Sequence, residues 1–471
     1  MTFEFAVTIF GLTILQLPLV LGSESGRILI SMAALIPFWL VIAQKVVIAP
    51  AISRRSKTAV VIAAQRVRRQ WPLILIIAAF AILISVAIVR ALFAERIEFR
   101  PAVVDLATWN TVMLFGAVVF LIPSRRPVPF VPAIALSLGI FLIVNVLLVV
   151  AGYTGVASDA QQLIGRAEML AGLGIDSERI VFPMASGINA IGLAAGACLV
   201  CSMLLATRPN ARAATRSLAF LFAAVSIGVI LGSDTRSAFV FALVIGGTMA
   251  AAPFRWLAVA RWLPVTLPLL PFVVIGVGLW LSHADVLFLI SRGSQDFATA
   301  NGRAVIWGSV LGELSHFSTV HIFGFGYLGA TASGVVHHFS YLFGKSYDEN
   351  ALTAHNTVLQ YTLDIGYIGA LLFLVMCGAI LSGLARVSVP ALQLRARLQI
   401  AVLLFLLIAG TTEACATIYE PETFYVLLLA LAAGVGLICE QREALTASRP
   451  RESGMDSRPV ALSVPAHVAP F

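Results

Sequence analysis

The sequence predicts an all-α polytopic membrane protein with about 12 transmembrane helices and one large polar loop. Of its 471 residues, 60% are hydrophobic and 11% are charged, and the mean hydropathy is +0.97. Soluble domains usually contain about 25% charged residues, so this composition excludes a water-soluble fold. The apolar residues also form runs of the length, about 20 residues, that a helix needs to cross a bilayer.

The expected spans occupy most of the chain up to residue 439. They are residues 5–22, 29–49, 71–93, 102–122, 130–151, 187–206, 217–232, 237–253, 263–282, 366–385, 399–416 and 423–439. The chain after residue 439 is rich in Arg, Ser, Glu and Pro and has no periodic apolar face. We therefore expect a transmembrane bundle over residues 1–439 and a disordered tail over residues 440–471.

The basic residues set the expected orientation. Of the 31 Lys and Arg residues, 21 fall in one set of loops and 10 in the other. Because loops rich in positive charge stay in the cytoplasm, both termini are expected to be cytoplasmic and residues 283–364 to lie outside. The same loops account for the net charge of +8, so the charge does not require a nucleic-acid partner.

Residues 283–364 form the longest stretch that is too polar to span a bilayer, and they hold six of the seven histidines. Within this stretch, residues 303–317 place apolar side chains near helical spacing, which predicts an amphipathic helix on the membrane face or on the bundle. Residues 322–327 are aromatic and glycine-rich, which indicates a turn or a re-entrant piece against the bundle. The chemistry of the protein is expected in this segment.

His355 is the candidate catalytic residue. It lies between Ala354 and Asn356, just before an expected span, where it would be partly removed from water. A neutral imidazole, with an ordinary pKa of about 6.5, can accept the proton of a hydroxyl nucleophile. A histidine that only ties the loop to the bundle through hydrogen bonds fits the sequence equally well.

Three arginines outside the expected cytoplasmic loops are candidate anion ligands. Arg303 opens the amphipathic helix, Arg236 lies in a tight turn between two spans, and Arg179 precedes the sixth span. A charge at such a place needs an anionic partner, and guanidinium groups bind phosphate oxygens in pairs. A pyrophosphate therefore suits them, while anchoring to lipid headgroups or to a carboxylate is the structural alternative.

The sequence does not favour a metal site or any other cofactor. His337 and His338 are adjacent and lie in the same segment as His316 and His321, but adjacent histidines rarely bind one ion, and no known metal-binding spacing is present. Residues 420–422, Glu-Pro-Glu, could hold a divalent ion, but a solvated acidic loop is the favoured interpretation.

Five short motifs occur in a fixed order over residues 185–385. They are Ser233–Ser237 (SDTRS), Asn301–Trp307 (NGRAVIW), Gly324–Tyr327 (GFGY), Ala354–Gln360 (AHNTVLQ) and Ile365–Gly369 (IGYIG). Together with the expected topology, this series resembles the O-antigen ligase-related family, which contains bacterial O-antigen ligases and the polymerases of O-antigen and exopolysaccharide.

The resemblance implies a GT-C-like glycosyltransferase architecture and metal-independent transfer from a glycan donor linked to undecaprenyl pyrophosphate. By motif, His355 matches the proposed base, and Arg303 and Arg236 match the arginines that bind the pyrophosphate. Arg179 and Asn356 are further expected substrate contacts. The resemblance also implies the bacterial inner membrane, an active site facing the periplasm, and contact with membrane lipids.

Two functions within the family remain open, since no motif separates them. A ligase transfers the glycan to a lipid A core, whereas a polymerase transfers it to a growing lipid-linked glycan. Outside the family, a transporter or lipid flippase would place ionisable groups near the membrane midplane, but the expected spans here are almost free of charge. A non-catalytic membrane scaffold would tolerate the loss of His355.

Overall fold

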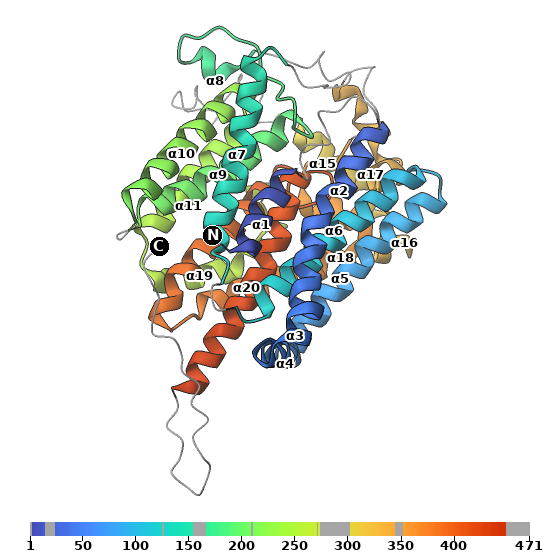
Figure 1. The fold of residues 1–471 in the computed structure, drawn as a ribbon. Helices are drawn as coiled ribbons and strands as arrows, with labels where there is room; N and C mark the ends of the chain where they lie inside the picture. Colours follow the sequence, from blue (N-terminus) through green and yellow to red (C-terminus); the bar gives the residue numbers. More distant parts are fainter. Residues whose placement is uncertain are drawn as a thin grey trace, which may run out of the picture.

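A computed structural model describes residues 2–14, 24–124, 127–153, 166–208, 211–270, 272–273, 302–343 and 352–448. These residues form a bundle of α-helices (Figure 1). The helices are α1 (Phe3–Ile14), α2 (Glu24–Ala43), α3 (Ala49–Ile52), α4 (Arg54–Arg69), α5 (Trp71–Phe93), α6 (Phe99–Leu121), α7 (Phe130–Val150), α8 (Glu168–Ala171), α9 (Ile188–Ala206), α10 (Ala213–Ser233), α11 (Arg236–Ala251), α12 (Leu263–Thr266), α15 (Arg303–Ser315), α16 (Val320–Phe323), α17 (Gly329–Ala332), α18 (Thr357–Ala385), α19 (Pro390–Ala409) and α20 (Pro421–Ala447).

The predicted all-α polytopic membrane fold is confirmed. Within the described residues, nine helical stretches are long and apolar enough to cross a membrane. Three of the expected spans are not among them. The first is represented by the 12-residue α1 and the eighth by the 16-residue α11, while most of the ninth, residues 263–282, lies outside the described residues. The total of twelve therefore stays a prediction.

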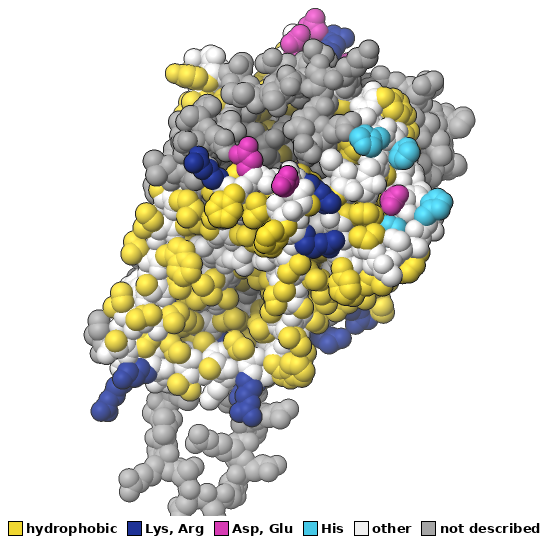
Figure 2. All heavy atoms as spheres, turned by 90° about the vertical axis from the view of Figure 1, so that its right-hand side faces the viewer, with side chains coloured by type: hydrophobic (Ala, Val, Ile, Leu, Met, Phe, Trp, Pro, Cys, Tyr) yellow, Lys and Arg dark blue, Asp and Glu magenta, His cyan; other side chains and the backbone are white. Residues whose placement is uncertain are grey.

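Two helices form the centre of the bundle. In their most apolar stretches, 94% of the residues of α20 and 83% of those of α9 are buried, compared with 22% for α5. Figure 1 shows α20 passing through the middle of the bundle. The outer helices instead present apolar side chains to their surroundings, and these form a broad apolar surface in Figure 2. Such an apolar surface is stable in contact with lipid tails, whereas its exposure to water is unfavourable.

The two ends of the bundle differ in chemistry. At one end lies the basic helix α4, beside the last turns of α20 (Figure 1). There Arg66 forms two hydrogen bonds, of 2.7 and 2.6 Å, with the carboxylate of Glu443. Because α20 continues to Ala447, residues 440–447 are helical, and the prediction of a tail starting at residue 440 was wrong for them. From residue 449 on, that tail lies outside the described residues.

The opposite end carries a second, smaller hydrophobic core. As predicted, residues 303–315 form an amphipathic helix, α15, which buries Ile306, Trp307, Val310 and Leu314. These side chains pack with apolar residues from 330–354 and with Leu363 of α18. The described part of the polar segment therefore packs as a layer on the bundle, and that layer can hold side chains in fixed positions.

The expected turn at residues 322–327 packs against a kink in α18. This helix begins at Thr357, nine residues before the predicted start of the tenth span, and has non-helical backbone angles at Gly366 (φ 73°, ψ −176°). The kink frees two carbonyls, which accept hydrogen bonds from the Phe325 and Gly326 amides at 2.7 and 3.0 Å. The turn thus replaces backbone hydrogen bonds that the kink removes.

Replacement of Gly366 by alanine should destabilise the folded protein. A Cβ at this position would clash with the carbonyl oxygen of Ile322, and the positive φ disfavours any L-residue. The strain alone is expected to cost about 1–3 kcal/mol, seen as a lower thermal unfolding midpoint. Gly378 on the same helix is the control, since its nearest non-local atoms would be 3.8 Å from a Cβ. Equal midpoints for the two variants would contradict the packing described.

Candidate functional site

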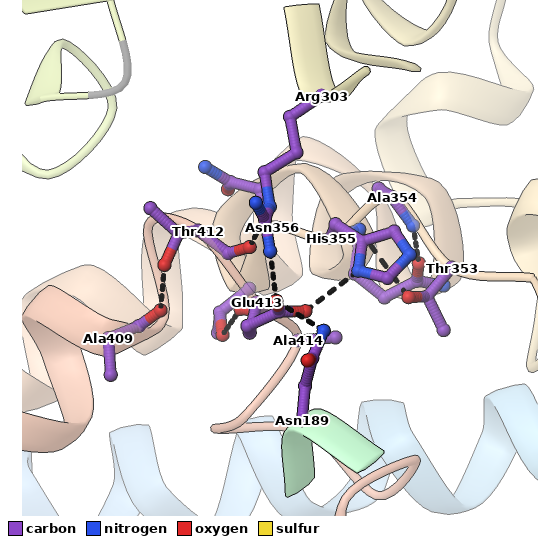
Figure 3. A network of polar contacts seen from close by, with 12 residues as sticks. Asn189, Arg303, Thr353, Ala354, His355, Asn356, Ala409, Thr412, Glu413 and Ala414 are labelled. Carbon is purple, nitrogen blue, oxygen red and sulfur yellow. Dashed lines mark hydrogen bonds and ion pairs between the residues drawn. The ribbon is translucent and has the colours of Figure 1, made fainter. Parts of the chain in front are cut away.

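The carboxylate of Glu413 is the centre of a polar network at the end of the bundle covered by α15. Glu413 lies in the loop between α19 and α20, and its side chain is 2% exposed. It accepts hydrogen bonds from Arg303, from His355 Nδ1 at 2.7 Å and from Asn189 Nδ2 at 2.9 Å. Figure 3 shows these side chains converging on Glu413 from separate segments of the chain. One carboxylate thus joins two residues that the sequence singled out.

Arg303 is placed by the start of α15. The preceding Gly302 has a positive φ of 80°, which lets the chain turn sharply into the helix. The guanidinium Nε donates to the carbonyl of Thr412 at 2.7 Å, and a terminal nitrogen donates to Glu413. The side chain remains 18% exposed, so it has donors left for another ligand.

His355 has a strained backbone and a fixed ring. Its φ is 44°, a left-handed conformation that is uncommon for residues other than glycine. Strain of this kind is often found at functional sites, where the surrounding structure holds it. The ring stacks on Phe343 with centroids 5.9 Å apart and is 23% exposed. Trp307 supports the loop, since its indole N–H donates to the Ala354 carbonyl at 3.1 Å.

Asn356, an expected substrate contact, serves here as the N-cap of α18. Its side-chain oxygen accepts from the Leu359 amide at 3.0 Å, and its amide nitrogen donates to the Thr411 carbonyl at 3.0 Å. The side chain is 2% exposed. Both ends of the amide are therefore bonded to the backbone, an arrangement that positions the neighbouring His355 against the loop that carries Glu413.

Arg179 joins the same network through a second residue. Its Nε donates to the Ser233 carbonyl at 2.9 Å, and a terminal nitrogen donates to Asn189 Oδ1 at 3.1 Å. Because the Asn189 amide in turn donates to Glu413, Arg179, Arg303 and His355 are linked. The structure thus brings together three of the residues named from the sequence.

Arg236 lies in the neighbouring turn. Its Nε is 3.3 Å from the Asp234 carboxylate, and its side chain is 12% exposed. Asp234 has a positive φ of 53° and also accepts from the Met169 amide at 3.1 Å. The turn touches the network through the Ser233 carbonyl, whereas the Arg236 side chain has an acidic partner of its own.

The charges around Glu413 decide its ionisation. Burial by itself raises the pKa of this carboxyl group, but attraction and hydrogen bonding from Arg303 and His355 outweigh burial and lower the pKa to about 2. Glu413 is therefore a carboxylate, which can only accept hydrogen bonds. It follows that His355 Nδ1 carries a proton and that, in the neutral ring, Nε2 is the basic nitrogen.

The low pKa of Glu413 predicts a pH dependence of stability. Because the pKa falls from 4.5 to about 2 on folding, the carboxylate stabilises the fold above pH 4.5, and this contribution is lost as the pH falls toward 2. Thermal unfolding between pH 7 and pH 3 should show a larger loss for wild type than for Glu413→Gln, which lacks the titrating group. Parallel curves would contradict the ion-pair assignment.

The other histidines of the segment have different positions. His321 is buried, and its Nδ1 accepts from the Ser318 amide at 3.1 Å, while its Nε2 lies 3.4 Å from Glu313. It packs against Phe325 and Tyr367, which indicates a structural role. Within the described residues, no group of three or more His, Cys, Asp or Glu side chains could hold a metal ion.

The interpretation of Glu420 and Glu422 as a solvated acidic loop was wrong. Glu422 is buried and accepts from the Ser186 amide and hydroxyl at 2.6 and 2.7 Å. Burial and the nearby carboxylates of Glu413 and Glu422 raise the pKa of Glu420 well above its usual value. Glu422 is therefore held inside the protein by Ser186, and Glu420 is half-buried.

Sequence reasoning missed Glu413. The signal that points to it is indirect: Arg303 needs an anionic partner, and Glu413 is an acid near the end of the expected span 399–416, on the same expected side of the membrane as Arg303. The partner could not be named from the sequence because 110 residues separate the two.

The fold and the site define a multi-pass membrane protein with a buried Arg–Glu–His centre at one end of its bundle. Residues 218–374 match the family model described as O-antigen ligase, so this part of the chain is O-antigen ligase-related, as the motifs predicted. The match runs from α10 to α18 and includes Arg236, Arg303 and His355, whereas Glu413 lies beyond it. No curated protein matches the chain.

Proposed function

We propose that this protein is a glycosyltransferase that moves a glycan from an undecaprenyl-pyrophosphate carrier to the hydroxyl of an acceptor. The observation that carries the proposal is the 2.7 Å contact between His355 Nδ1 and the Glu413 carboxylate, inside a chain whose residues 218–374 match the O-antigen ligase family. A carboxylate behind a histidine fixes the imidazole tautomer, and the other ring nitrogen can then act as a base.

In the proposed reaction, His355 Nε2 takes the proton of the acceptor hydroxyl. The oxygen then forms a bond to the anomeric carbon of the donor sugar, and the bond from that carbon to the pyrophosphate breaks, with its electron pair leaving on the phosphate oxygen. Glu413 stabilises the imidazolium that forms. Such a base accounts for about 10²–10⁴-fold of a rate enhancement.

Arg303 and Arg179 are the proposed ligands of the pyrophosphate. Arg303 uses two of its five N–H groups on Thr412 and Glu413, which leaves donors for phosphate oxygens. Positive charge fixed beside the leaving group stabilises the charge that develops on it, so the transfer is proposed to be metal-independent. Arg236 is proposed as an outer contact, because Asp234 already balances its charge.

The proposed location is the bacterial inner membrane, with the site facing the periplasm and both termini in the cytoplasm. The basic helix α4 and the end of α20 lie at the end opposite the Glu413 network (Figure 1), and positive charge favours the cytoplasmic side. A site at the periplasmic end suits a lipid-linked donor that enters from the bilayer. A GT-C-like architecture is part of this proposal.

Deletion of the gene tests the function and separates its two forms. A ligase, whose acceptor is a lipid A core, predicts long carrier-linked chains that stay unattached to the cell surface. A polymerase, whose acceptor is a growing glycan, predicts accumulation of single carrier-linked repeat units. We favour the ligase. Unchanged amounts and lengths of surface glycan in the deletion strain would contradict both forms.

A further inference from the structure

A pair of arginines lies at the end of α5, away from the Glu413 network. Arg90 donates to the carbonyl of Gly324 at 2.9 Å, and Arg96 donates to the carbonyl of Phe325 at 2.8 Å. Both therefore contact the turn that packs on the kink of α18. Arg90 is exposed and Arg96 is half-buried, so the pair can be reached from outside the protein.

The end of α5 folds back to bring the two side chains together. Glu95 has a positive φ of 56°, and the amides of Arg96 and Glu95 bond to the carbonyls of Ala91 and Leu92 at 2.9 and 3.0 Å. This is a Schellman motif, which ends a helix and reverses the chain. As a result, Arg96 returns to the same turn that Arg90 contacts, and the pair is fixed by the backbone.

The charges of the pair are not balanced by an acid in the described part of the chain. Both guanidinium groups donate there to backbone carbonyls, and each side chain keeps further N–H donors. Burial and the positive charge of Arg90 lower the pKa of Arg96. Two like charges held close at the end of a membrane span favour a bound anion.

We propose that Arg90 and Arg96 bind the phosphate group of an anionic membrane lipid. Arg90 lies in the last turn of the span Trp71–Phe93, which is the depth of the lipid headgroups. Planar guanidinium groups suit phosphate oxygens better than point charges do. On the face seen in Figure 2, basic side chains lie where the apolar surface meets the polar end of the molecule. The site does not depend on the proposed glycan transfer.

Binding of phosphatidic acid to the purified full-length protein in detergent tests this site. The double variant Arg90→Gln with Arg96→Gln should bind this lipid at least about tenfold more weakly than wild type, because charge-assisted hydrogen bonds are lost. Arg100→Gln is the matched control: it removes an exposed charge of the same region and should bind within about twofold of wild type. All variants keep the Glu413 network, so any binding there contributes equally.

Three results would overturn the proposal. They are equal affinity of wild type and the double variant, equal losses in the double variant and Arg100→Gln, and binding of phosphatidylcholine as tight as that of phosphatidic acid. Inorganic phosphate should bind far more weakly than the lipid, since it lacks the apolar anchor; equal affinity would show a site for the free anion instead. Should the double variant not fold, Arg90→Gln alone, at an exposed position, should still weaken lipid binding severalfold.

Discussion

His355→Ala is expected to abolish glycan transfer while the protein stays in the membrane. The variant removes the proposed base, and the loss should be at least about 10²-fold in kcat, the lower range for general base catalysis. His316→Ala is the control, because His316 is exposed in the same outer layer and bonds only locally, to Gly312 and Ser315. Transfer should be measured with purified protein and carrier-linked glycan, beside the amount of each protein in the membrane.

A second substitution separates the base from the backbone strain at residue 355. Asparagine tolerates the left-handed conformation far better than alanine does, so His355→Asn should fold like wild type, with φ near the observed 44°. It lacks a group that can take a proton at neutral pH. An inactive His355→Asn with an unchanged unfolding midpoint supports a catalytic role, whereas an active one would show that His355 only shapes the loop.

Glu413→Gln should reduce transfer by about 10²-fold or more. The amide can present its N–H₂ group to His355 and thereby select the wrong tautomer, and loss of the corresponding carboxylate in a known hydrolytic triad costs about 10⁴. It also leaves the Arg303 charge without its carboxylate partner. Because the side chain of residue 413 is only 2% exposed, water cannot replace that partner, and the folded protein loses stability. The pH profile of kcat should therefore change with the rate, because the carboxylate no longer stabilises the imidazolium.

Glu422→Gln provides the matched control for this substitution. It makes the same change, from acid to amide, at a buried position nearby, where the partners are the Ser186 amide and hydroxyl. Equal losses of activity in the two variants would show that any buried acid of this loop is needed for folding. A loss confined to Glu413→Gln, with an altered pH profile, is the expected result.

The helices were predictable because apolar runs of membrane length leave little choice of structure. The amphipathic helix was predictable for a similar reason: its apolar side chains recur with helical spacing, and Ile306, Val310 and Leu314 are among the residues it buries. The start of α18 was not. Residues 357–365 include polar side chains such as Gln360 and Asp364, and a hydropathy argument therefore excluded them from the span.

Those polar side chains are satisfied by distant partners. Asp364 accepts from the Gly329 amide and from Gln360, both at 2.9 Å, and from the Tyr419 hydroxyl at 3.1 Å. Gln360 also accepts from the Ala354 amide at 2.8 Å. No local pattern predicts such contacts, because they depend on how separate segments pack. Glu413 was missed for the same reason, although its partners Arg303 and His355 could be identified from the sequence as candidates by their chemistry.

Asn356 shows a different limit. Its place beside His355 in a family motif predicted a substrate contact, but the structure gives its amide two backbone partners at 3.0 Å. A motif records which residues occur together and not what each one does. A residue that caps the helix beside the proposed base and a residue that contacts the substrate appear in a motif in the same way.

The role of His355 as the base is tested most directly by a transfer assay with purified protein in liposomes that contain a carrier-linked glycan and an acceptor. With wild type we expect one free undecaprenyl pyrophosphate for each new glycosidic bond, and with His355→Asn neither product above background. Stoichiometric transfer by His355→Asn at the wild-type rate would contradict the claim that the His355–Glu413–Arg303 centre performs the reaction.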